Sequence, residues 1–96
     1  MKSEVISKLT DQAVDKKRSV VVSGHRTSVS LEPVFWEQLG VLAAKQRISV
    51  NELVTRIDQR KSGSLTSAIR VFVLKSVQQK LRTVRAVSDA GLPYPR

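Results

Sequence analysis

The clearest pattern in the chain is a strict alternation of apolar and polar positions over residues 26–31. A repeat of two residues is typical of a strand with one buried face. The sequence therefore predicts one short β-strand, packed on a core by one face and exposed on the other. The core face carries Thr27, Val29 and Leu31, and the exposed face carries Arg26, Ser28 and Ser30.

The segment just before this strand, residues 19–25, is also rich in β-branched residues. Gly24-His25 is either a two-residue turn, which would let residues 20–23 fold back onto the strand, or a kink. A lone strand leaves backbone N–H and C=O groups unpaired on both edges. We expect it to pair either with residues 20–23 or with its copy in a second subunit across a two-fold axis, which also doubles the core.

Two helices follow the strand. Pro33 cannot donate to a strand ladder and its fixed φ suits a first helical turn, so it begins a helix predicted over 33–46. Ser49-Val50-Asn51-Glu52 is a capping box, in which Ser49 accepts from the Glu52 backbone and the Glu52 side chain reaches back. It begins a second helix, predicted over 50–60. Their apolar stripes include Phe35, Leu39, Leu53 and Ile57.

A third helix follows a break at Lys61-Ser62-Gly63, with Ser64 as its cap, and is predicted from 65 to about 83. We divide the chain into a basic polar arm over 1–18, a domain over 19–83 and a flexible tail over 84–96.

The charge of the chain points to a polyanionic partner. There are 17 Lys and Arg against 8 Asp and Glu, a formal net charge of +9. Neutralising phosphates with such charges releases counterions and drives binding to nucleic acid. Double-stranded DNA is therefore the expected partner, and no membrane is expected because the apolar runs are too short to span a bilayer.

Several chemistries find no support in the residues. The chain has no cysteine, and His25 is the single histidine, without a carboxylate cluster nearby, so we expect no metal and no cofactor. No catalytic triad or phosphate loop is recognisable, so an enzyme is not expected. With no signal peptide apparent, we expect a cytoplasmic protein.

The segment from Gly24 to Leu53, GHRTSVSLEPVFWEQLGVLAAKQRISVNEL, resembles the ribbon-helix-helix domains of Arc/MetJ-type bacterial repressors, particularly a branch of small uncharacterised proteins. The resemblance covers roughly residues 18–80. It implies a mainly α fold with one short strand, and an intertwined homodimer with a two-stranded antiparallel ribbon. The third helix is an addition to the pattern of many members.

The resemblance also assigns roles to residues. The outward strand residues of the family touch bases, which here implies base contacts from Arg26, Ser28 and Ser30. Arg can bond guanine O6 and N7 together, and Ser hydroxyls suit base edges. The start of the second helix implies a phosphate contact, which its free N–H groups and dipole also favour. The expected phosphate-contacting residues are His25, Lys45, Arg47, Ser49, Val50 and Asn51, and the expected dimer core is Thr27, Val29, Leu31, Phe35, Leu39, Leu53 and Ile57.

The sequence thus predicts a sequence-specific DNA-binding homodimer, a transcriptional regulator of the repressor kind that reads the major groove with its ribbon. A second hypothesis is a protein-interaction module, such as an antitoxin-like or adaptor dimer. It would hold a partner protein through the third helix or the termini.

Overall fold

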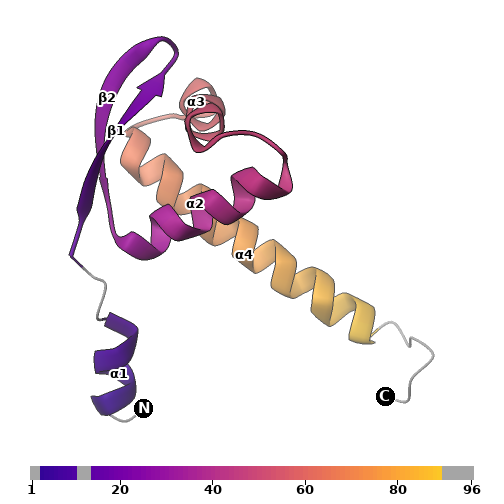
Figure 1. Ribbon diagram of the computed structural model, residues 1–96. Helices are drawn as coiled ribbons and strands as arrows, with labels where there is room; N and C mark the ends of the chain where they lie inside the picture. The colour runs from indigo at the N-terminus through magenta and orange to yellow at the C-terminus, as the bar shows by residue number, and fades with distance from the viewer. Residues whose placement is uncertain (1–2, 11–13, 90–96) are drawn as a thin grey trace.

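The computed structural model describes residues 3–10 and 14–89, which form a β-hairpin and four helices (Figure 1). The hairpin lies to one side of α2 and α3, and the second half of α4 extends away from it. None of the helices in these ranges is long and apolar enough to cross a membrane. In chain order the elements are α1 (Ser3–Thr10), β1 (Lys16–Val22), β2 (His25–Leu31), α2 (Pro33–Lys45), α3 (Val50–Arg60) and α4 (Leu65–Asp89).

The chain pairs its strand with a second strand of its own, which corrects the expectation of a single strand. β1 runs antiparallel to β2, in a register that extends from Lys16 opposite Leu31 to Val22 opposite His25. Ser23 and Gly24 form the turn, with φ values of 51° and 82°. Two consecutive positive φ angles are typical of a type I′ turn, whose twist matches that of a hairpin. The fold-back alternative is therefore right, with the turn one residue earlier than expected.

The alternation along β2 is confirmed by burial. Val29 and Leu31 are buried and Thr27 is half-buried, while Arg26 and Ser28 are exposed. From β1, Val20 and Val22 join the same buried layer. One face of the hairpin therefore packs on the helices and the other faces outward.

α2 begins at Pro33 as predicted and ends at Lys45, one residue earlier than expected. Its end is a Schellman motif, because the backbone N–H of Ile48 donates to Ala43 and that of Arg47 donates to Ala44. Arg47 takes the left-handed position of this motif, with φ 58°.

α3 has the bounds that the capping box predicts. Ser49 Oγ accepts from the Glu52 backbone N–H at 3.0 Å. The Glu52 carboxylate pairs with Arg56 one turn later, 3.4 Å away, rather than reaching back to Ser49. The core face of α3 consists of Leu53, Val54 and Ile57.

α4 begins as predicted, after Gly63 at φ 95°, with Ser64 Oγ accepting from the Ser67 N–H. It continues past the expected end near residue 83 to Asp89, so residues 84–89 are helical. Residues 65–90 contain no Gly or Pro that would stop the helix. Residues 90–96 lie outside the described ranges, and the division into arm, domain and tail stays a prediction.

The core also draws on α2 and α4. Ile69 and Val73 of α4 and Trp36 of α2 are buried with the strand and α3 residues. Of the residues expected in a dimer core, Val29, Leu31, Leu39, Leu53 and Ile57 are buried, and Thr27 and Phe35 are partly buried. Their contribution to a dimer stays a prediction.

Candidate nucleic-acid interface

The hairpin face that points away from the helices, called the outer face below, carries side chains from both strands. The register puts Lys17 opposite Ser30, Ser19 opposite Ser28 and Val21 opposite Arg26. All six side chains are exposed except that of Ser30, which is half-buried. The three residues expected to contact bases therefore lie together on an uncovered surface, beside a lysine and a serine of β1.

One edge of the hairpin is covered by α3. Asn51 Oδ1 accepts from the backbone N–H of Val21 at 3.4 Å. Thr55 Oγ1 donates to the Val21 carbonyl at 3.3 Å and accepts from the Ser23 N–H at 3.4 Å. The backbone groups of β1 that point away from β2 thus have partners beside the turn.

The other edge, along β2, is open. Backbone groups in an antiparallel pair alternate between pointing into the ladder and away from it. The backbone N–H and C=O of Val21 point away from β2, so those of the opposite residue Arg26 point away from β1. The same holds for the backbone groups of Ser28 and Ser30. Their backbone N–H and C=O groups have no hydrogen-bond partner within the described ranges.

The start of α3 has free donors close to the hairpin. The first-turn N–H groups of Val50 and Asn51 have no acceptor among the described residues, since the first bonds of the helix begin at Glu52 and Leu53. The Asn51 side chain, bonded to Val21, fixes this helix end beside the β1 edge.

A family model described as "Ribbon-helix-helix domain" matches residues 15–77 of the chain, about two thirds of its length. The chain belongs to this family. Ribbon-helix-helix domains are in general DNA-binding domains of transcription regulators, and their fold is not an enzymatic one. The resemblance noted in the sequence is thereby confirmed.

A solved structure supports the same fold. The chain is similar to an uncharacterized protein from Bordetella pertussis Tohama I, with 26% identity and a TM-score of 0.66. The similarity covers 95% of this chain and 81% of the other. No functionally curated protein matches the chain.

The basic run at the N-terminal end of the ribbon-helix-helix domain is part of a strand. Its residues Lys16, Lys17 and Arg18 lie inside β1. The indole Nε1 of Trp36 donates to the Lys16 carbonyl at 2.8 Å, and the Arg18 guanidinium lies 5.1 Å from the centre of the Trp36 ring. Arg18 is therefore turned towards the helices, whereas Lys17 lies on the outer face.

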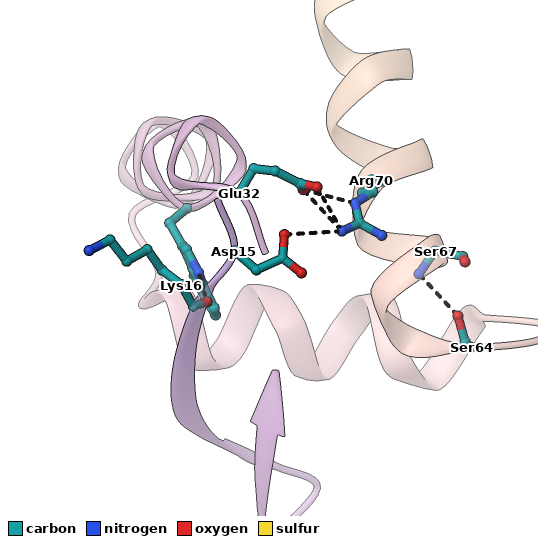
Figure 2. Close-up of polar contacts among 7 residues, drawn as sticks. Asp15, Lys16, Glu32, Ser64, Ser67 and Arg70 are labelled. Atoms are coloured by element: carbon teal, nitrogen blue, oxygen red, sulfur yellow. Dashed lines mark hydrogen bonds and ion pairs between the residues drawn. The ribbon is translucent and has the colours of Figure 1, made fainter. Parts of the chain in front are cut away.

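The end of β2 is tied to α4. Arg70 donates to both carboxylate oxygens of Glu32, at 3.0 and 3.1 Å, and lies 4.0 Å from Asp15 (Figure 2). A hydrogen bond from its own backbone and the bonds and charge of Arg70 outweigh desolvation and lower the pKa of the Glu32 carboxyl. The pair holds the strand against the helices just where the outer face ends.

The other expected phosphate contacts are dispersed. Arg47 is exposed in the connection just before Ser49, whereas Lys45 lies at the end of α2 beside Lys80 of α4. The neighbouring Lys80 ammonium, through its like charge, and desolvation lower the pKa of Lys45. His25 is exposed at the first position of β2. Their contacts with DNA stay predictions.

Sequence reasoning missed Lys17 and Ser19 as members of the outer face. The signal was present, because Ser23-Gly24 follows the apolar positions Val20 and Val22 as a hairpin turn would.

The side chains of the described residues include no cluster of three or more potential metal ligands.

Proposed function

We propose that this protein is a homodimeric, sequence-specific DNA-binding regulator of transcription that acts as a repressor. The proposal rests on two features of the same strand, β2. Its outer face presents Arg26, Ser28 and Ser30, and its edge has unpaired backbone groups. The face supplies side chains that can bond base edges, and the edge supplies backbone groups through which two copies can pair.

Dimerisation uses the open edge. The outward N–H and C=O groups of Arg26, Ser28 and Ser30 pair with the same groups of a second copy across a two-fold axis. The resulting sheet has the order β1-β2-β2-β1, with the two β2 strands at its centre. It satisfies backbone groups that one chain leaves open, and it brings the two outer faces into one surface.

The width of that sheet decides which strands read bases. Strands lie about 4.8 Å apart, so four of them span about 14 Å, more than the major groove width of about 12 Å. The central β2 pair therefore faces the base edges. The β1 strands flank it near the phosphates, where Lys17 adds a positive charge.

The rest of the interface positions the ribbon. The free N–H groups of Val50 and Asn51 bind one phosphate at each flank, because α3 begins beside the β1 edge. Further contacts to DNA phosphates come from Arg47, Lys45 and His25, and these raise the affinity for all DNA sequences alike. Specificity rests on Arg26, through guanine O6 and N7, and on the two serines.

Selection of bound duplexes from a random pool by the purified full chain tests the proposal. Enrichment of an inverted or direct repeat, with guanine at fixed positions, is the expected result. A pool that stays random at moderate salt, although the protein is folded, would overturn sequence-specific binding.

A further inference from the structure

From its middle turns onward, α4 carries apolar side chains that a single chain leaves exposed. Leu74, Val77, Leu81 and Val84 are 56%, 39%, 65% and 57% exposed, respectively. A single exposed apolar side chain needs no explanation, but four along one helix are a surface feature. We call these four residues the α4 seam.

The seam has the spacing of a helix-pairing surface. Its members are separated by three, four and three residues, which is the a/d pattern of a heptad repeat over about two heptads. The core residues of the same helix, Ile69 and Val73, occupy different heptad positions and lie nearer its start. In Figure 1 the seam half of α4 extends beyond α2, away from the hairpin.

The charges beside the seam decide which helix fits. In this register Lys80 and Arg85 occupy the g and e positions, from which side chains reach the partner helix. Residues 74–85 contain Lys75 and Arg82 as well, and no Asp or Glu. Pairing with α4 of a second copy would bring like charges together, in either direction of the helices.

We propose that the α4 seam docks an acidic amphipathic helix of another protein. Its apolar a and d residues would cover the seam, and its Glu or Asp residues at e and g would face Lys80 and Arg85. This activity goes beyond DNA binding and leaves the hairpin free, because the outer face and the seam lie on different elements.

The test uses a dye-labelled synthetic helix of about three heptads, with Leu at a and d and Glu at e and g. A matched peptide carries Lys in place of Glu. Fluorescence anisotropy with the full chain should show the acidic peptide binding at least about tenfold more tightly, a difference of about 1.4 kcal/mol. Equal binding of the two peptides, or no binding, would overturn the proposal.

Variants of the chain separate docking from simple charge attraction. The double change Leu74→Gln and Leu81→Gln should weaken binding of the acidic peptide at least about tenfold. Val41→Gln, at a position of α2 that is 42% exposed, is the control and should leave binding unchanged. An unchanged affinity in the double variant would mean that the seam only attracts polyanions, which contradicts docking.

Charge reversal gives a second readout. The double change Lys80→Glu and Arg85→Glu should shift the preference towards the basic peptide. Circular dichroism should show that the helix content of the variant is unchanged. If the unmodified chain instead self-associates in a way that Leu74→Gln and Leu81→Gln abolish, the occupant is a second copy and the proposal fails. DNA binding, measured in parallel, should be unaffected by the leucine changes, so failure here is distinguishable from failure of the DNA-binding proposal.

Discussion

The amide oxygen of Asn51, in the first turn of α3, accepts a hydrogen bond from the backbone N–H of Val21 in β1. This bond sets the position of the start of α3, the proposed phosphate site, relative to the outer face of the hairpin, which we propose reads bases. Thr55, one turn further, bonds the same stretch of backbone through its hydroxyl.

The Thr55 hydroxyl should therefore contribute to stability. Thr55→Val keeps the shape of the side chain but leaves the Val21 carbonyl and the Ser23 N–H without their partner. We expect a loss of about 1 kcal/mol in the free energy of unfolding, measured by urea titration. Thr66→Val, at a half-buried position of α4 whose side chain makes no hydrogen bond to the described residues, is the control. Equal losses in both variants would contradict a role for the β1 bonds.

Arg26 and Lys17 should differ in what they contribute to DNA binding. Arg26→Ala should relax sequence preference, at about 1 to 3 kcal/mol for a lost bidentate base contact. Lys17→Ala should weaken binding to specific and random duplexes alike and reduce its salt dependence.

Competition binding with a selected and a scrambled duplex measures this difference, and Lys75→Ala on α4 controls for loss of charge. Should Arg26→Ala weaken both duplexes equally, the assignment of the outer face to base contacts would be wrong.

The ion pair between Glu32 and Arg70 should make stability depend on pH. Because the pKa of Glu32 is lowered in the folded state, the unfolded chain binds a proton more readily. The stabilisation is therefore complete above the ordinary pKa near 4.5 and is lost as the pH falls through the lower folded value.

Glu32→Gln should accordingly lower the melting temperature at pH 7, and the difference from the unmodified protein should shrink towards pH 3. Glu37→Gln, at an exposed position of α2, is the control. A deficit of the same size at both pH values would show that packing rather than charge is lost.

Arg47 combines an unfavourable backbone conformation with a useful charge. A side chain in the left-handed region costs about 1 kcal/mol relative to glycine. Arg47→Gly should therefore raise the free energy of unfolding by about that amount and weaken DNA binding. Ser23→Gly, also at a positive φ, should stabilise the protein without weakening binding as much. Unfolding curves and binding isotherms of the two variants check both effects.

The helices and the faces of β2 were predictable because local residues set them. Pro33, Ser49 and Ser64 mark helix starts through φ restriction and capping, which depend on few neighbours. The alternation at residues 26–31 needed only a core on one side. Such features follow from short-range chemistry.

β1 and its neighbours were less predictable because they depend on distant parts of the chain. The like-charged run Lys16-Lys17-Arg18 is typical of a solvated arm, and it becomes strand only through pairing with β2 and the contacts of Trp36. The bond from Val21 to Asn51 joins residues 30 positions apart. The extension of α4 to Asp89 followed from the absence of a stop signal rather than from a clear apolar period.

The central claim is that two copies pair through the open edge of β2. Ser28→Pro removes an N–H that points away from β1, so it should spare the hairpin and break pairing between copies. Ser19→Pro, directly opposite on β1, removes an equivalent outward N–H from the other edge and is the matched control.

Sedimentation velocity at micromolar concentration tests this claim most directly. The unmodified chain and Ser19→Pro should sediment as a species of twice the 10.7 kDa of one chain, and Ser28→Pro as a folded monomer that no longer binds DNA. A Ser28→Pro protein that remains dimeric, or an unmodified protein that is monomeric at that concentration, would contradict the account.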